Sequence, residues 1–324
     1  MRILFVTATR VGDSIMSTGI LDRLLDENPG AKVTVACGPG AAQLFTEVPG
    51  LERLIRLEKK PYSMHWLGLW TACVGRLWDV VIDLRNAPLT YLIPTKRAHH
   101  VSRGRRDRVP GHRVKELAEA AGMTGEPPAP RIWISDRHRE KARDLVPDGP
   151  PVLALGPTAN WPVKQWPQER FGELAERLTG PDGILPGARI ALIGNGDERD
   201  GVIPLIESIP AERFVDLVWD VDLLTVSACM ERMALYVGND SGLMHLSAAT
   251  GLPTLGLFGP TPVTEYAPWG AHCDAVAISE NYHEVFPEGF DHRSTETLMS
   301  DLSVDQVEAA ARTLWARAGG EEVN

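Results

Sequence analysis

The sequence lacks the patterns that mark membrane-spanning and disulfide-rich proteins. No apolar run approaches the roughly 20 residues that a transmembrane helix needs, and the longest, residues 66–75, ends before Arg76. The apolar stretch at residues 3–8 is too short for the core of a signal peptide. The four cysteines lie far apart without a Cys-x-x-Cys pair, which favours buried free thiols over a disulfide framework or a zinc site. We therefore expect a cytoplasmic protein.

Two common nucleotide-binding motifs are also missing. No Gly-x-x-x-x-Gly-Lys-Ser/Thr segment occurs, which excludes P-loop chemistry. A dinucleotide-binding pattern begins at Gly194-Asn195-Gly196 but fails at its third glycine, where Arg199 stands, so a Rossmann dehydrogenase is disfavoured. Asp220 and Asp222 resemble a metal-binding Asp-x-Asp pair, but Asp222 precedes a helical run and is better explained as a helix N-cap.

Basic residues are scarce in the second half of the chain. The 324 residues carry 33 Lys and Arg against 43 Asp and Glu, for a net charge of −10. Residues 1–150 hold 23 basic and 17 acidic side chains, whereas residues 151–324 hold 10 and 26. The mild total therefore conceals a net charge of +6 in one half and −16 in the other. This asymmetry indicates that the two halves meet different partners.

Both halves alternate strand-like and helical segments. The apolar patterns predict strands at 2–7, 32–36, 79–83, 152–155, 189–193, 234–237 and 254–258, and helices at 13–27, 114–121, 168–178, 242–249 and 304–316. Pro/Gly-rich segments at 124–130 and 147–151 mark a linker region. We infer two α/β domains, 1–150 and 151–324, each with a parallel sheet that binds ligands beyond its carboxyl edge. We also consider that the last helix packs back on the N-terminal domain.

Two of the loops at strand ends carry candidate chemistry. Val11-Gly12-Asp13-Ser14 joins the first strand to the first helix, so Asp13 is either a helix cap or a carboxylate that takes a proton from a bound hydroxyl. Segment 156–167, GPTANWPVKQWP, combines small and hydroxylated residues with one lysine, Lys164. In an acidic half, that lysine is either solvated surface or a phosphate ligand.

The strongest signal is segment 238–246, GNDSGLMHL. A buried strand runs through a tight Asp-Ser-Gly turn into a helix, which exposes backbone N–H groups and the positive end of the helix dipole. Ser241 adds a hydroxyl donor, and His245 on the first helical turn either reaches the same anion or packs in the core. The segment thus predicts an anion-binding site.

In this order, the segments VGDS, WPVKQWP, NDSGLMHLSAATGLP and LFGPTPV resemble glycosyltransferase family 9, the ADP-heptose:lipopolysaccharide heptosyltransferase family. The resemblance implies a GT-B fold, in which two Rossmann-like domains face each other across a cleft. The N-terminal domain binds the acceptor and the C-terminal domain binds the nucleotide-sugar. It also implies an inverting transfer of heptose from ADP-heptose to a lipopolysaccharide core acceptor, without a bound metal or other cofactor.

Two alternatives stay open at this point: a GT-B enzyme with another nucleotide-sugar or acceptor, and a catalytically silent nucleotide-binding protein. Under the main interpretation, the resemblance makes Asp13 the general base. Val221 stands for the segment 219–223, where backbone groups meet the adenine. The donor-binding residues implied are Thr158, Asn160, Lys164, Val221, Asp240, Ser241, Gly242 and His245. These roles suit a reaction in which a hydroxyl loses a proton while negative charge grows on the departing ADP.

A basic segment covers residues 96–113, with seven Lys and Arg against one acid, Asp107. It is either a solvated loop or, by the resemblance, an acceptor-binding patch that includes Arg103, Arg105, Arg106 and His112. Such a patch would attract the anionic lipopolysaccharide core and the cytoplasmic face of the inner membrane, so we expect peripheral membrane contact. Nucleic acid is a disfavoured partner because the chain is acidic overall. Segment 281–297 lacks the cysteines that many relatives carry there, and no role is assigned to it.

Overall fold

The computed structural model describes residues 1–101, 111–278 and 297–319. The chain divides into two compact units, unit 1 (Met1–Ser135) and unit 2 (Asp136–Asn324). Each unit is an α/β sandwich around its own parallel sheet, as the alternation of segments predicts.

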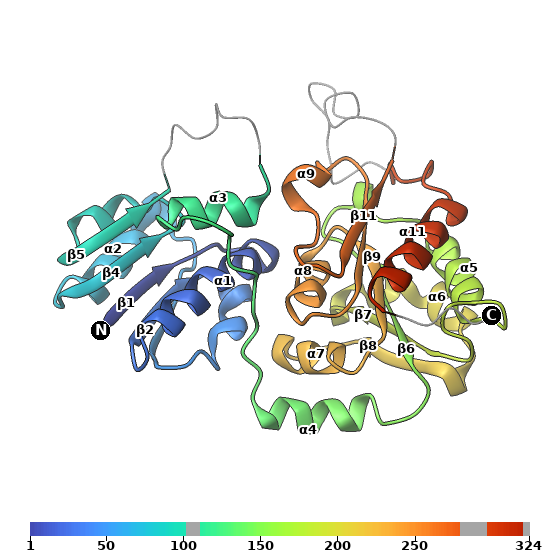
Figure 1. The fold of residues 1–324 in the computed structure, drawn as a ribbon. Coiled ribbons are helices and arrows are strands. Elements are labelled where there is room, and N and C mark those ends of the chain that lie inside the picture. Colours follow the sequence, from blue (N-terminus) through green and yellow to red (C-terminus); the bar gives the residue numbers. More distant parts are fainter. Residues whose placement is uncertain (102–110, 279–296, 320–324) are drawn as a thin grey trace. The chain divides into compact units, whose positions relative to one another are not determined.

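Unit 1 contains a five-stranded parallel sheet of order β3-β2-β1-β4-β5. Its strands are β1 (Arg2–Val6), β2 (Lys32–Cys37), β3 (Leu51–Arg56), β4 (Trp78–Asp83) and β5 (Thr95–His100). The helices are α1 (Val11–Glu27), α2 (Met64–Cys73) and α3 (Arg113–Ala120), with 3-10 turns η1 (Pro39–Phe45), η2 (Pro61–Ser63) and η3 (Pro88–Leu92) (Figure 1). Alternate residues of β1 serve the two faces, and Leu4 and Val6 pack with Leu69 and Cys73 of α2.

Unit 2 contains a six-stranded parallel sheet of order β11-β10-β9-β6-β7-β8. Its strands are β6 (Val152–Gly156), β7 (Arg189–Gly194), β8 (Phe214–Val218), β9 (Leu235–Asn239), β10 (Thr254–Phe258) and β11 (Cys273–Ala277). Its helices are α4 (Asp136–Leu145), α5 (Gln168–Thr179), α6 (Ile203–Ser208), α7 (Leu223–Met230), α8 (Gly242–Ala249), α9 (Val263–Tyr266) and α11 (Val304–Arg317), and its 3-10 turns are η5 (Pro162–Lys164), η6 (Gly196–Val202) and η7 (Ala211–Arg213).

The helices of unit 2 cover both faces of its sheet (Figure 1). One core joins Leu153 and Leu155 of β6 to Phe171 of α5 and to Val307 and Leu314 of α11. The last helix therefore packs in the core of unit 2. A reciprocal capping box between Ser303 and Gln306 fixes where it begins.

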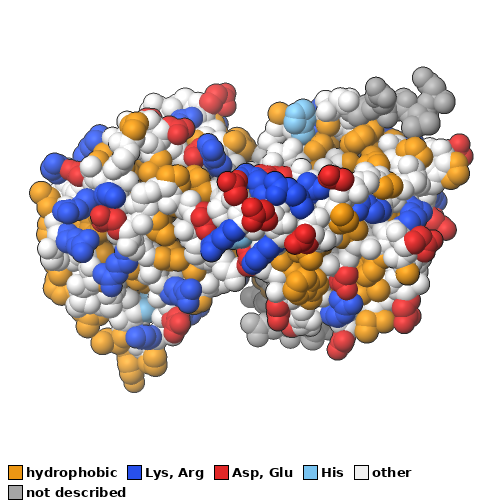
Figure 2. Space-filling model, turned by 90° about the horizontal axis from the view of Figure 1, so that it is seen from below, with side chains coloured by type: hydrophobic (Ala, Val, Ile, Leu, Met, Phe, Trp, Pro, Cys, Tyr) orange, Lys and Arg blue, Asp and Glu red, His pale blue; other side chains and the backbone are white. Residues whose placement is uncertain are grey.

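Helix α4 places the start of unit 2 at residue 136, whereas the linker pattern put it at 151. The helix lies between the two Pro/Gly-rich segments and packs against α7. His138 and Ala142 are buried there, and the Arg139 guanidinium meets Glu231 through two hydrogen bonds of 2.9 and 3.1 Å. Figure 2 views this side of the molecule, where acidic and basic side chains are intermixed. Because residues 136–150 carry equal numbers of each sign, the units keep net charges of +6 and −16.

No helix in the described parts of the chain is long and apolar enough to cross a membrane. All four cysteines are free thiols; Cys37, Cys73 and Cys229 are buried and Cys273 is half-buried. Burial raises the pKa of Cys73 to about 11 and the pKa of each of the others to about 12. The thiols are therefore neutral near pH 7, as expected for cysteines that serve packing.

Candidate functional site

The predicted donor-binding residues of unit 2 gather where the strand order of its sheet reverses. From β6 the chain proceeds to β7 and β8 on one side, then returns to β9 on the other side of β6. The loops that follow β6 and β9 therefore lie at the switch point of the sheet, where open α/β sheets bind ligands beyond their carboxyl edge. Residues 157–167 follow β6, and the Asp240-Ser241 turn follows β9. The two strongest sequence motifs of this half thus meet at one place.

Asn239, the last residue of β9, fastens these two loops together. Its side-chain oxygen accepts a hydrogen bond of 3.0 Å from the Trp166 backbone N–H, and its Nδ2 donates to the Pro157 carbonyl at 2.9 Å. Asn239 is fully buried, so both bonds are shielded from water. One side chain therefore holds both ends of the 157–166 loop. Its place in the motif was noticed from the sequence, but this role was missed.

Lys164 and Asp240 form an ion pair across the two loops. The Lys164 Nζ lies 2.5 Å from an Asp240 carboxylate oxygen, and the side chains are only 16% and 7% exposed. The ammonium also lies 4.9 Å from the centroid of the Trp161 ring, within range of a cation–π contact. Lys164 is therefore a fixed, largely buried cation, and the alternative of a solvated surface lysine is wrong.

Ser241 and Gly242 form the start of α8. Ser241 is extended (φ −146°, ψ 173°), and its hydroxyl makes no capping hydrogen bond to the helix. The first N–H groups of α8 therefore receive no bond from the residue best placed to cap them. His245 lies on the first turn and is buried. The turn thus keeps the anion-binding character that its sequence predicts, with a helix dipole behind it.

Beneath this turn, the Tyr236 and Ser241 hydroxyls are both buried without a partner in hydrogen-bonding geometry. Burial raises the pKa of Tyr236 well above its usual value, which the nearby Ser241 hydroxyl opposes in part. The phenol lies across two glycines: a Cβ on Gly156 would overlap its hydroxyl, and one on Gly238 would lie 2.5 Å from it. The sequence offers no direct signal for this tyrosine, although the two glycines mark the space that it fills.

Thr158 is also buried, and its hydroxyl donates to Glu198 at 2.9 Å. The same carboxylate oxygen accepts a 2.9 Å bond from the backbone N–H of Asn195, within a capping box that begins η6. The Gly-Asn-Gly segment after β7 is therefore a helix cap tied to the β6 loop. Asn160, the other polar residue predicted in that loop, is exposed.

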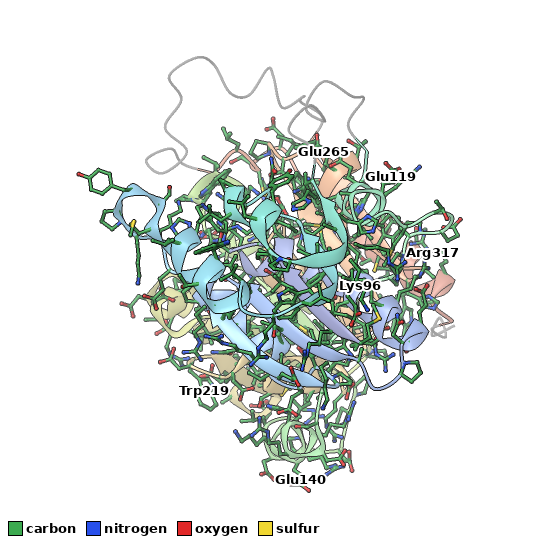
Figure 3. All side chains as sticks on the ribbon, turned by 90° about the vertical axis from the view of Figure 1, so that its left-hand side faces the viewer. Lys96, Glu119, Glu140, Trp219, Glu265 and Arg317 are labelled. Carbon is green, nitrogen blue, oxygen red and sulfur yellow. The ribbon has the colours of Figure 1, made fainter. Side chains whose placement is uncertain are left out.

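The loop after β8 holds the residues predicted to meet the adenine. The Val221 backbone N–H donates to the Trp219 carbonyl at 2.7 Å, which makes a tight local turn. Trp219 is 45% exposed and projects outward (Figure 3). Asp222 caps α7 as expected, accepting bonds of 2.9 and 2.7 Å from the Thr225 N–H and hydroxyl. Burial would raise the pKa of Asp222, but these bonds and the nearby His138 and Lys141 hold it below its usual value.

In unit 1, Asp13 lies in the first turn of α1, but it is not the cap. The helix begins at Val11 with Arg10 as the N-cap, so Asp13 occupies the third helical position. Ser14 anchors this turn by donating to the Ala8 carbonyl at 3.1 Å. Of the two interpretations of Asp13 from the sequence, the N-cap is therefore wrong. Asp13 is instead a half-buried carboxylate at the positive end of α1, beyond the carboxyl end of β1.

The described residues include only part of the predicted acceptor-binding patch. Arg103, Arg105 and Arg106 lie outside the described residues. His112 is the N-cap of α3, where its Nδ1 accepts a 3.2 Å bond from the Val114 N–H. Of segment 281–297, only Thr297 is described; its hydroxyl donates to the Gln165 carbonyl at 2.5 Å. The chain after the undescribed segment is thus tied to the loop that carries Lys164.

Comparisons with known proteins converge on one family. The model described as "Glycosyltransferase family 9 (heptosyltransferase)" matches residues 79–288, a range that includes Lys164 and Asp240 but not Asp13. Lipopolysaccharide heptosyltransferase 1 of Pseudomonas aeruginosa is 27% identical over 303 residues, which cover 81% of this chain and 79% of that protein. Lipopolysaccharide heptosyltransferase 2 of Salmonella typhimurium is 24% identical over 168 residues, 49% of this chain and about half (47%) of that protein.

The fold is also that of a solved relative. The structure of ADP-heptose lipopolysaccharide heptosyltransferase II from E. coli matches with a TM-score of 0.73 at 20% identity, covering 98% of this chain and all of the other. The predicted GT-B architecture, with two Rossmann-like units in one chain, is confirmed.

Proposed function

The chain belongs to glycosyltransferase family 9, the heptosyltransferase family, and from this premise we propose that it transfers a heptose from ADP-heptose to a lipopolysaccharide core acceptor. The transfer inverts the anomeric carbon, with unit 2 binding the donor and unit 1 the acceptor. The observation that carries the donor assignment is the Lys164–Asp240 pair beside the start of α8.

The donor site supplies groups of both signs, as a nucleotide-sugar requires. Lys164 and the N–H groups at Ser241 and Gly242 suit the diphosphate, since each carries full or partial positive charge. Asp240 suits the sugar hydroxyls, since a carboxylate only accepts hydrogen bonds. Thr158, Asn160 and His245 line the same edge of the sheet, and the backbone near Val221 receives the adenine. Asn239 positions both loops without touching the ligand in this proposal.

Asp13 acts as the general base. Its carboxylate takes the proton of the acceptor hydroxyl while the hydroxyl oxygen bonds to the anomeric carbon of the donor. The bond from that carbon to the diphosphate oxygen breaks, and its electron pair leaves with ADP. Attack opposite the leaving group inverts the configuration in one displacement. The charge that grows on ADP is balanced by Lys164 and the α8 terminus, so the proposal includes no bound metal or other cofactor.

The acceptor carries negative charge, which suits the net charge of +6 in unit 1. Arg103, Arg105, Arg106 and His112 are proposed acceptor contacts. We further propose that the enzyme works at the cytoplasmic face of the inner membrane as a peripheral protein. Attraction of about 1 kcal/mol for each basic residue near an anionic surface supports this location.

A nucleotide-release assay tests the proposal. Parent protein is incubated with ADP-heptose, other ADP-sugars and UDP-sugars, each with truncated core acceptors. We expect ADP release with ADP-heptose only, and Asp13→Asn should lower kcat by roughly 10²- to 10⁴-fold, the usual contribution of a general base. Its affinity for ADP should stay unchanged.

Each alternative outcome has a separate meaning. Release from another sugar nucleotide would replace the donor, and ADP binding without any turnover would favour a silent nucleotide-binding protein. Full activity of Asp13→Asn would remove Asp13 from the mechanism. Lys164→Ala serves as the matched donor-side variant, because it should weaken ADP binding, which Asp13→Asn leaves intact.

A further inference from the structure

Arg85 lies where the strand order of the unit 1 sheet reverses. From β1 the chain goes to β2 and β3 on one side, then crosses to β4 and β5 on the other. The segments after β1 and β4 therefore lie at the switch point of the sheet, beyond the carboxyl edge, where open α/β sheets bind ligands. Val6 at the end of β1 pairs with Asp83 at the end of β4, and the Leu84 N–H donates to the Val6 carbonyl at 2.9 Å. Asp13 lies in the element after β1, and Arg85 two residues beyond β4.

The turn that carries Arg85 is held by one buried carboxylate. Asp83 is fully buried and accepts hydrogen bonds from the Arg85 N–H at 2.8 Å, the Ala87 N–H at 2.7 Å and the Thr90 hydroxyl at 2.6 Å. Asn86, the residue after Arg85, has a φ of +53°. Three hydrogen bonds and a left-handed residue give this turn a defined backbone, so the base of the Arg85 side chain is fixed.

The guanidinium of Arg85 is half-buried and incompletely bonded. Its central carbon lies 4.7 Å from the centroid of the Trp66 ring, so the group rests on an indole face. The Nη1 atom is buried and has no hydrogen-bond partner among the described residues. Burial lowers the pKa of Arg85, although the guanidinium stays charged. A desolvated donor without an acceptor is costly, and such groups in native structures call for a partner.

The described residues around Arg85 provide little negative charge to neutralise its guanidinium. The Cys37 thiol nearby is neutral, because burial raises its pKa to about 12. Burial lowers the pKa of His65, as do Arg85 and Lys59, so this ring is neutral at pH 7. Asp83 is the carboxylate that acts on Arg85, but its oxygens already accept the three bonds within the turn. The described surroundings of Arg85 thus leave its guanidinium able to pair with an anion from outside.

We infer that Arg85 binds an anionic group of the acceptor, a carboxylate or a phosphate, and is a specificity-determining residue of unit 1. The planar guanidinium presents paired N–H donors that match the two oxygens of such a group. Asp13 and Arg85 follow the neighbouring strands β1 and β4 at one edge of the sheet, so a molecule that Asp13 deprotonates at this edge can also be contacted by Arg85. The inference rests on the proposed function and adds a residue that the basic segment at 96–113 does not contain.

The test compares Arg85→Gln with the parent on three acceptors: the truncated core, the same core with its carboxyl groups reduced to alcohols, and the core with its phosphates removed. Arg85→Gln should lower kcat/KM for the intact acceptor by roughly 10- to 100-fold, mainly through KM, the scale of a hydrogen-bonded charge pair. On the acceptor that lacks the bound group, parent and variant should differ by less than about threefold. The acceptor that abolishes the difference identifies the group as carboxylate or phosphate.

Controls separate binding from folding. Arg2→Gln removes the same charge from an exposed position at the amino end of β1, outside the basic segment, and should leave the acceptor KM within about twofold of the parent. Arg85→Lys keeps the charge but loses the fork, and should give an intermediate KM. Unchanged ADP affinity and melting temperature in Arg85→Gln would show that both units remain folded.

The result that overturns the inference is an equal loss on all three acceptors, or no loss on the intact one. A parent that transfers no sugar to any lipopolysaccharide acceptor would overturn the proposed function, and this inference with it. Failure of the inference alone is recognised by an active parent whose Arg85→Gln variant shows the parental pattern of acceptor preference.

Discussion

At the scale of single residues, the sequence singled out the residues of the proposed donor site but not the contacts that hold them. Lys164 and Asp240 stand 76 positions apart, and each was singled out from its own loop. Their pairing depends on β6 and β9 being neighbours, which the order of elements along the chain does not reveal. Asn239 and Tyr236 were missed for the same reason, because Asn239 bonds to the loop after β6 and the Tyr236 ring lies against Gly156 of β6.

The glycines beneath the donor turn lead to a stability prediction. Gly156→Ala should lower the free energy of unfolding by about 1–3 kcal/mol, because the added methyl group would overlap the Tyr236 hydroxyl. Tyr236→Phe alone should be close to neutral or stabilising, since that hydroxyl is buried without a partner.

Urea unfolding of the two single variants and the double variant measures this coupling. The double variant should recover part of the loss in Gly156→Ala, because removal of the hydroxyl leaves room for the methyl group. If the stability changes of the two single variants simply add in the double variant, the Gly156 methyl group does not overlap the Tyr236 hydroxyl. A matched control is Gly187→Ala, where no atom lies near the added carbon but φ is +69°, so any loss there is due to the backbone.

At the scale of elements, the sequence predicts the central strands and the long helices well, but it does not predict the edge strands of the unit 1 sheet. Helix α8 and strand β10 have the predicted bounds, because apolar runs and the flanking turns agree at both ends. The edge strand β5 reads TKRAHH and β3 reads LERLIR, and charged residues on their open faces hide the strand pattern. Helix α4 was overlooked because it lies between two Pro/Gly-rich segments.

The cap of α7 gives a prediction for pH dependence. Asp222→Ala should lower the free energy of unfolding at pH 7 by about 1 kcal/mol, the usual contribution of an N-cap. The folded state holds the pKa of Asp222 below its unfolded value. The carboxylate therefore adds stability above the unfolded pKa, near 4, and this contribution disappears as pH falls through the folded pKa.

Denaturant unfolding at pH 7 and near pH 3 measures the contribution of Asp222 to stability when its side chain is charged and when it is partly protonated. The difference in the free energy of unfolding between parent and Asp222→Ala should be smaller at the lower pH. A larger difference there would mean that folding raises the pKa of Asp222 instead of lowering it. Asp220→Ala is the control, because Asp220 precedes the helix by three residues and does not cap it.

At the scale of the whole molecule, the two units carry opposite net charges whether the boundary between them is placed after residue 135 or after residue 150. These net charges are +6 and −16 in both cases. The proposed donor site in the acidic unit relies on one buried lysine and a helix terminus rather than on bulk charge. The net charge of a unit therefore describes its long-range field, whereas the bound group is chosen by a few local contacts.

The boundary itself can be tested with fragments. A fragment of residues 136–324 should be more stable than one of 151–324 by roughly 2–4 kcal/mol, since the shorter one loses the buried contacts of His138 and Ala142 and the Arg139–Glu231 pair. Thermal unfolding of both measures the difference. Equal melting temperatures would mean that α4 adds nothing to unit 2.

The Asn239 clamp has a consequence for the order of events during synthesis. Its two bonds join positions 73 and 82 residues apart, so the loop with Lys164 cannot close when it leaves the ribosome. The loop waits until β9 has been translated and has inserted beside β6, after β7 and β8. A nascent chain that stops short of residue 239 lacks the clamp, whatever else has folded. Closure of this loop thereby becomes a late step, which reports that the middle of the second sheet is complete.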